Sequence, residues 1–166
     1  NQLLEEVSYD YAANSIIARS TNASVIAHVF AFNKNGQIWG PTTAYIGAVG
    51  IAINPSTGTV AVASSKLGEN QIVLISPSGN LEQRFGVEGE LLTVIVTTDG
   101  VHTIAVTTTG LQIFDSTTGD SLWRVDYPTN SVARMPSNNT LVLAGSKGVG
   151  AFSIHGTQLW TIPGLA

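Results

Sequence analysis

The stretch FDSTTGDSLW, residues 114–123, decides the fold because near-copies of it recur along the chain. The other copies are FNKNGQIW at 32–39, FSIHGTQLW at 152–160 and a degraded form, LISPSGNL, at 74–81. Each copy holds one turn glycine, and these are Gly36, Gly79, Gly119 and Gly156. Successive turn glycines are separated by about 40 residues, which indicates an internal structural repeat.

Upstream of every turn glycine, two alternating apolar runs flank a polar turn. The four pairs of runs are VSYDYAANSIIARS at 7–20, IAINPSTGTVAVASS at 51–65, VIVTTDGVHTIAVTT at 94–108 and VARMPSNNTLVLAGS at 132–146. Turn cores such as STGT, TDGV and SNNT are typical of hairpins, because Gly and Asn tolerate positive φ. A third run precedes the turn glycine and a fourth follows it. Each repeat therefore predicts one four-stranded antiparallel sheet.

The expected fold class is all-β, in a single domain of 166 residues. The predicted sheets span about 3–43, 44–89, 90–127 and 128–163. A helical alternative exists only near the N-terminus, where Leu3, Leu4, Val7, Tyr11 and Ile16 approach helical spacing. Alignment of this segment with the other hairpins favours strands, with a short helical turn allowed in the first six residues.

The string Asp115-x-x-Thr118-Gly119-x-x-x-Trp123 resembles the tryptophan-docking repeat of PQQ-like, quinoprotein-type β-propellers. The other copies resemble the degenerate form of archaeal and bacterial surface propellers, and the resemblance covers nearly the whole chain. It implies a β-propeller of about four blades, in which large apolar side chains on the outer strands fill the wedge between blades. The expected docking residues are Trp39, Trp123 and Trp160, with Leu81 and Phe85 taking this place in the second blade.

Four blades are fewer than the family usually has, so three arrangements stay open. The chain belongs to a larger propeller as a half, closes with a second copy, or makes a small ring. A half-propeller exposes two sheet faces that carry aromatic residues, and large apolar patches are rare on monomers. The expected partner is therefore another propeller segment or a second copy of the chain, with other surface proteins as further candidates.

Composition excludes several other classes of protein. Charged residues make up 11% of the chain, the formal net charge is −4, and Lys34, Lys66 and Lys147 are scattered, which argues against nucleic-acid binding. The absence of cysteine excludes disulfides, thiolate metal sites and thiol nucleophiles. No apolar run reaches the ~20 residues of a membrane-spanning helix, so no membrane span is expected.

No catalytic, cofactor-binding or metal-binding group of residues is expected. His28, His102 and His155 fall at positions that differ between blades, so convergent metal ligation is not indicated. Turn hydrogen bonds account for Asp99 and Asp115. The stretch GSKGVG at 145–150 lacks a following helix and predicts a strand–strand turn, not a phosphate site. The remaining candidates, Glu88 and Glu90 in an inter-blade connection, are expected to be solvated loop charges.

Two glycosylation acceptors, at Asn22 and Asn138, lie in predicted turns. Together with the low lysine content they favour an extracellular or cell-surface protein, in particular an archaeal one. The predicted function is a non-catalytic extracellular scaffold for protein interaction or assembly. Two alternatives remain at this point: a fragment of a PQQ-dependent dehydrogenase, and a structural subunit of a surface layer or filament.

Overall fold

The computed structural model describes residues 3–10, 15–21, 26–46, 48–66, 69–135 and 137–164, with side chains from Val29 onward except at 33, 37, 39–47 and 66. Within these ranges the regular structure consists of β-strands, which form four sheets of four strands each. In every sheet the strand order follows the chain and neighbouring strands are antiparallel. The predicted all-β fold class is confirmed.

Each sheet is built from one continuous segment of the chain. The first sheet holds β1 (Leu3–Asp10), β2 (Ser15–Thr21), β3 (Ile26–Asn33) and β4 (Gly36–Ile46). The second holds β5 (Ala48–Ile53), β6 (Val60–Lys66), β7 (Glu69–Ile75) and β8 (Leu81–Gly86). The third holds β9 (Leu91–Val96), β10 (His102–Thr107), β11 (Gly110–Asp115) and β12 (Ser121–Asp126). The fourth holds β13 (Ser131–Met135), β14 (Thr140–Gly145), β15 (Gly148–Phe152) and β16 (Gln158–Pro163).

The N-terminal segment forms strands and not a helix. β1 pairs antiparallel with β2, so that Val7 lies opposite Ala18 and Tyr9 lies opposite Ile16. Such pairing uses the two-residue alternation of a strand, which the sequence shares with the other three hairpins. The strand prediction for this segment is confirmed.

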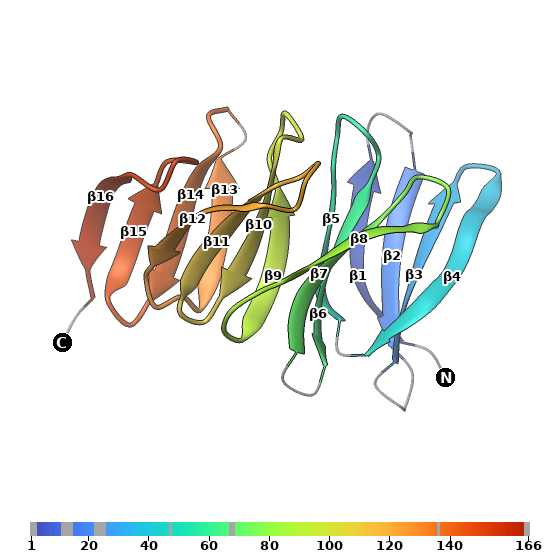
Figure 1. Cartoon of the computed structure of the whole chain (residues 1–166), viewed down its shortest axis with the longest axis horizontal. Helices are drawn as coiled ribbons and strands as arrows, with labels where there is room; N and C mark the ends of the chain where they lie inside the picture. Colours follow the sequence, from blue (N-terminus) through green and yellow to red (C-terminus); the bar gives the residue numbers. More distant parts are fainter. Residues whose placement is uncertain are drawn as a thin grey trace.

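The four sheets stand face to face in one row along the longest axis of the molecule, as Figure 1 shows. The first sheet, which contains the N-terminal strands, lies at one end of the row, and the fourth lies at the opposite end. The row is therefore open, since a closed ring would bring these two sheets together. Of the arrangements left open by the sequence, this one is a partial propeller.

Three apolar clusters fill the spaces between neighbouring sheets. In β6, the fully buried Val62 belongs to the cluster shared with the first sheet, and the next residue, Ala63, belongs to the cluster shared with the third. In β10, Ala105 belongs to the cluster shared with the second sheet, and the next residue, Val106, belongs to the cluster shared with the fourth. Successive side chains of a strand point to opposite faces, so both middle sheets are covered on both sides.

Polar contacts also join neighbouring sheets. At the hairpin turns, Asn54 Nδ2 donates to the carbonyl of Gly100 at 2.8 Å. Near the other end of the strands, the buried Gln112 holds the connection between the second and third sheets. Its Nε2 donates to the Glu88 carbonyl at 2.6 Å, and its Oε1 accepts from the Glu88 N–H at 3.1 Å. The connection is thereby fixed against the third sheet.

Candidate functional site

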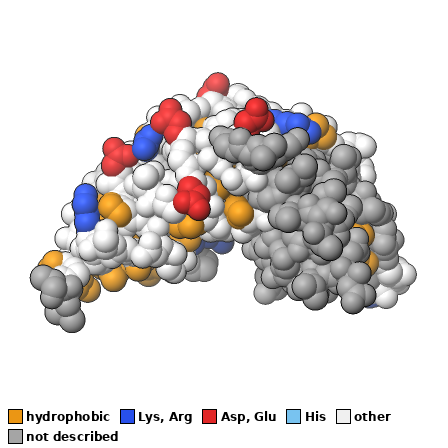
Figure 2. All heavy atoms as spheres, turned by 90° about the horizontal axis from the view of Figure 1, so that it is seen from below, with side chains coloured by type: hydrophobic (Ala, Val, Ile, Leu, Met, Phe, Trp, Pro, Cys, Tyr) orange, Lys and Arg blue, Asp and Glu red, His pale blue; other side chains and the backbone are white. Residues whose placement is uncertain are grey.

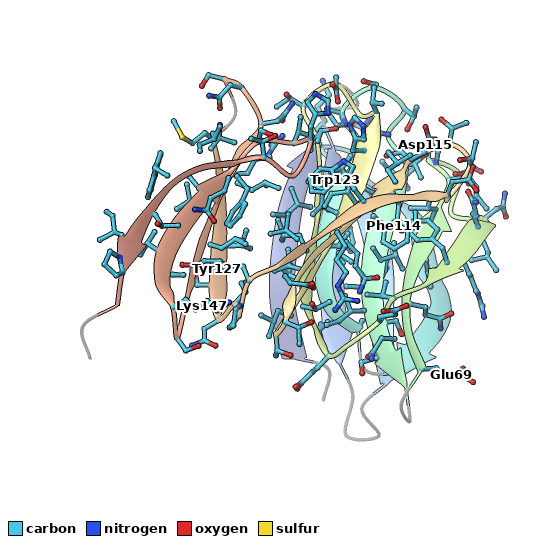
Figure 3. All side chains as sticks on the ribbon, turned by 60° about the vertical axis from the view of Figure 1, so that its left-hand side comes forward. Glu69, Phe114, Asp115, Trp123, Tyr127 and Lys147 are labelled. Carbon is cyan, nitrogen blue, oxygen red and sulfur yellow. The ribbon has the colours of Figure 1, made fainter. Side chains whose placement is uncertain are left out.

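The contact between the third and fourth sheets centres on Trp123, which lies on β12 opposite Ile113 (Figure 3). The indole ring packs against the apolar cluster between these sheets and against Gly156, in the turn between β15 and β16. A Cβ atom at Gly156 would lie 2.8 Å from Trp123 Cε3, and the φ of this glycine is +81°. Both the backbone angle and the ring contact require glycine here.

The equivalent contact between the second and third sheets has a different residue. Counting four residues from the turn glycine, as from Gly119 to Trp123, leads from Gly79 to Gln83. Gln83 Nε2 donates to the Thr118 carbonyl at 2.5 Å, beside the turn glycine of the third sheet. The second sheet thus docks through a carboxamide where the third sheet uses an indole.

The two residues expected to dock the second sheet differ in their outcome. Phe85 is 8% exposed, and its ring lies 4.7 Å from that of Phe114 in the third sheet. Leu81 is 49% exposed, so the expectation that it fills the interface is wrong. Leu81 precedes the bulge at which β8 changes register with β7, so its side chain is not carried into the interface. Of the expected tryptophans, Trp39 has its side chain outside the described residues.

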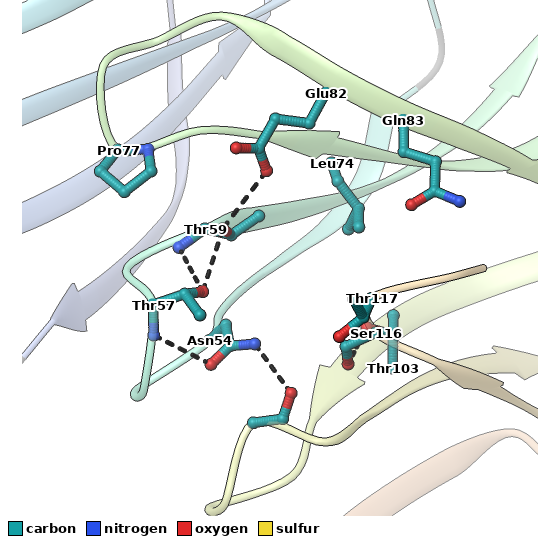
Figure 4. Close-up of a pocket in the computed structure, with 11 residues that line it drawn as sticks. Asn54, Thr57, Thr59, Leu74, Pro77, Glu82, Gln83, Thr103, Ser116 and Thr117 are labelled. Carbon is teal, nitrogen blue, oxygen red and sulfur yellow. Dashed lines mark hydrogen bonds between the residues drawn. The ribbon is translucent and has the colours of Figure 1, made fainter.

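A cavity of about 630 Å³ opens beside Gln83, between the turns of the second and third sheets (Figure 4). Most of its lining residues carry a hydroxyl or amide group, namely Asn54, Thr57, Thr59, Gln83, Thr103, Ser116 and Thr117, and Glu82 supplies a carboxylate. Several of these groups bond to one another. Thr103 and Ser116 share a hydrogen bond of 2.9 Å, and Thr59 Oγ1 donates to Glu82 Oε2 at 3.4 Å. Among the described lining residues Glu82 is the one titratable group, so these residues provide no pair for acid–base catalysis.

The fourth sheet exposes an apolar face at the end of the row. Cross-strand pairing places two rows of side chains on this outer face: Ala133, Val142, Ala151 and Trp160, and Ser131, Ala144, Val149 and Ile162. None of these side chains is charged. Trp160 and Ile162 are 45% and 60% exposed, whereas Ala151 is buried within its row. Figure 2 shows hydrophobic side chains gathered near this C-terminal end of the molecule.

The same two rows exist on the third sheet, where the fourth sheet covers them. The corresponding residues are Ile95, Ile104, Ile113 and Trp123, and Thr93, Val106, Leu111 and Val125. Ile104, Ile113 and Val106 are completely buried there. The outer face of the fourth sheet therefore repeats a contact surface of the third sheet, with Trp160 in the place of Trp123.

The titratable residues singled out in the sequence act in turns or at the surface. Hydrogen bonds from the backbone N–H groups of Thr118 and Thr117 hold the pKa of Asp115 below its ordinary value of 3.8. A hydrogen bond from the Thr97 hydroxyl, followed by one from the Val101 N–H, lowers the pKa of Asp99. Both carboxylates stabilise turns, as expected.

Glu88 and Glu90 are both exposed, and Glu88 forms an ion pair of 2.7 Å with Arg124 on the surface. His102 begins β10 and is half-buried, His155 is exposed in a turn, and the side chain of His28 lies outside the described residues. Among the residues that the structure describes, no three His, Asp or Glu side chains gather into a group able to hold a metal ion.

Of the two predicted glycosylation acceptors, the structure describes Asn138. Asn138 is exposed in the turn between β13 and β14, where its Oδ1 accepts a hydrogen bond from the Thr140 N–H at 3.1 Å. Asn22 lies outside the described residues.

The GSKGVG stretch at 145–150 forms the end of β14, a turn and the start of β15. No helix in the described ranges has the length and apolar character needed to cross a bilayer.

No protein-family model and no curated protein sequence matches the chain. Solved structures do resemble it. A protein of unknown function from Bacteroides caccae superposes with a TM-score of 0.66 at 14% identity, over 98% of this chain and 61% of the other. The Dos1 propeller superposes with a TM-score of 0.75 at 11% identity, over 96% of this chain and 46% of the other. The chain thus spans about half of that propeller and has a β-propeller fold in the form of an open segment.

Proposed function

We propose that the chain is a non-catalytic β-propeller scaffold, located outside the cell, that binds a further propeller blade through the outer face of its fourth sheet. The partner is a sheet of the same kind because this face has the shape and chemistry of an inter-blade contact. A blade offers a flat apolar surface and a turn glycine, the two features that the third sheet meets on the fourth.

One observation carries the proposal: rows that are buried on the third sheet are repeated on the fourth and left uncovered. Val106 is completely buried by the adjoining sheet, whereas its counterpart Ala144 is half-exposed. Val125 is 7% exposed, whereas its counterpart Ile162 is 60% exposed. Removing such surface from water contributes about 25 cal/mol per Å² of apolar area. Binding a blade would therefore bury the outer face of the fourth sheet, as the fourth sheet buries the corresponding face of the third.

The extracellular location is proposed from the sequence. Asn138 carries an acceptor motif on an exposed turn at the hairpin end of the fourth sheet. A glycan there would project from a turn, and it would leave the rows around Trp160 accessible. Mass spectrometry of the natural protein, with and without enzymatic deglycosylation, tests this part of the proposal. An unmodified Asn138 in the natural protein would leave the location without that support.

Substitution of Trp160 by Glu tests the binding face, because it places a charge at the end of one apolar row, on the strand β16. We expect the wild-type chain either to associate in light scattering or to bind the apolar dye 8-anilinonaphthalene-1-sulfonate, and Trp160→Glu to lose whichever response is present. Leu159→Glu is the matched control, since its counterpart Leu122 remains 46% exposed although the third sheet is covered. Equal responses of the wild type and Trp160→Glu would contradict the proposal.

A further inference from the structure

The first sheet carries a turn glycine that none of the described residues covers. Gly36, between β3 and β4, has a φ of +120°, and a Cβ atom placed there would meet no atom within 4 Å. The corresponding Gly156 lies against the Trp123 ring, and Gly119 lies against Gln83 and Phe85. In both described junctions, a side chain of the preceding sheet thus sits on the turn glycine of the next sheet. Gly36 has the same place in the repeat, and no residue that the structure describes lies on it.

An aromatic residue beside this glycine shows the same difference in environment. Phe152 stands four residues before Gly156, is 3% exposed, and meets Tyr127 edge-on at a ring distance of 5.3 Å. Phe32 stands four residues before Gly36 and is only half-buried. It stacks on Phe30 with a ring distance of 6.0 Å. The first sheet therefore presents the receiving half of an inter-blade contact, and Trp160 at the other end presents the donating half.

We propose that the partner of the fourth sheet is the first sheet of a second copy of this chain, with Trp160 of one copy docking on Gly36 of the next. This inference rests on the proposed function and identifies the blade that it leaves open. The contact is head-to-tail, since it joins two different surfaces of the same molecule. It continues the geometry of the junction between the third and fourth sheets, where an indole covers a turn glycine and an aromatic side chain packs beside it.

The two surfaces match in chemistry as well as in position. The rows around Trp160 contain no charge, and Phe30 and Phe32 supply apolar surface beside Gly36. Apolar burial and not ion pairing stabilises such a contact, so added salt is expected to leave the association undiminished. A second consequence follows from head-to-tail joining. Every copy keeps both halves of the contact, so two copies either close on each other or continue into a longer assembly.

Complementation between two variants tests the inference. Trp160→Glu removes the donating half and leaves Gly36 intact, whereas Phe32→Glu removes the receiving half and leaves Trp160 intact. Sedimentation velocity should show the wild type above one chain mass and each variant alone at the single-chain mass of 17.3 kDa. An equimolar mixture of the two variants should form a 1:1 complex of twice that mass, because each supplies the half that the other lacks. Circular dichroism melts check that both variants are folded.

The outcomes separate this inference from the proposed function. If Trp160→Glu abolishes association but Phe32→Glu does not, the fourth sheet binds something other than the first sheet, and the inference fails while the proposed function stands. If the mixed variants stay at one chain mass, the contact is not head-to-tail and the inference also fails. A wild type at one chain mass at all concentrations, with dye binding that depends on Trp160, likewise overturns the inference alone. If Trp160→Glu changes neither association nor dye binding, both fail.

Discussion

The junction between the third and fourth sheets and the junction between the second and third sheets have the same backbone plan but different side chains. In the former, Trp123 lies on Gly156 and extends the apolar cluster to the outer strand. In the latter, Gln83 occupies that place and bonds to the Thr118 carbonyl. The turns that carry the glycines differ as well. Ile154, in the turn of the fourth sheet, packs on the apolar cluster between the third and fourth sheets. Ser116 and Thr117, in the turn of the third sheet, line the cavity between the second and third sheets.

The difference shows that the buried apolar clusters between the sheets determine packing more strongly than the docking position does. Both junctions retain a continuous buried core, and the rings of Phe85 and Phe114 meet in the one that lacks tryptophan. Replacing the indole by a carboxamide therefore does not separate the sheets. It exchanges apolar contact at the outer strand for one hydrogen bond and a polar cavity.

Removing the ring that distinguishes the two junctions should have the largest effect. We expect Trp123→Ala to lower the free energy of unfolding by about 3 kcal/mol, the lower end of the range for large aromatic truncations, because the ring is only partly buried. Gln83→Ala should cost about 1 kcal/mol or less, since it removes one hydrogen bond near the surface. Urea titrations of both variants measure the difference. Equal losses would show that the two junctions do not differ in the way described.

The sequence is sufficient to predict the four sheets, but it does not predict the side chain that docks the second sheet on the third. Turn glycines and alternating runs predict all four hairpins, including the N-terminal one, because these signals are local. A residue count from Gly79 leads to Gln83, whereas the expectation of a large apolar side chain favours Leu81. The open row was one of three arrangements that the sequence left open. Closure depends on the angle between successive sheets, which is set by packing across interfaces and not by the repeat length.

Restoring tryptophan to the second junction should have a smaller effect of opposite sign. Gln83→Trp places an indole beside Gly119 and into the cavity, and we expect the free energy of unfolding to rise by about 1 kcal/mol. The gain is limited because the hydrogen bond to the Thr118 carbonyl is lost and the hydroxyls of Ser116 and Thr117 remain polar neighbours. A urea titration measures the change. A clear loss of stability would indicate that the cavity is not shaped for a ring.

The smallest expected effect on stability comes from protonation of Asp115, which distinguishes the turn of the third sheet from that of the fourth. Asp115 accepts the backbone hydrogen bonds in the turn of the third sheet, whereas the neutral Ser153 accepts them in the fourth. Because the pKa of Asp115 is lowered by folding, its contribution to stability is present above its ordinary value and is lost as the pH falls through the folded value. Asp115→Asn keeps the acceptor oxygen but removes this titration.

Urea midpoints at about pH 6 and about pH 3 measure that effect. We expect the midpoint of Asp115→Asn to fall less on acidification than that of the wild type. Ser153→Asp is the reciprocal variant, and its midpoint should fall more than that of the wild type. If all three chains lose stability equally, the carboxylate in the third turn does not contribute to the acid sensitivity of the fold.

The chain-order arrangement of strands within each sheet has a consequence for how the protein folds. Every strand pairs with the strand just before or after it, so each sheet closes through short loops with a small loss of chain entropy. Contacts between sheets then join only neighbours in the sequence, as in linear repeat proteins. During synthesis, a completed sheet can therefore serve as a template on which the next one condenses. For the fourth sheet, which carries Trp160, such a template is the outer face of the third sheet.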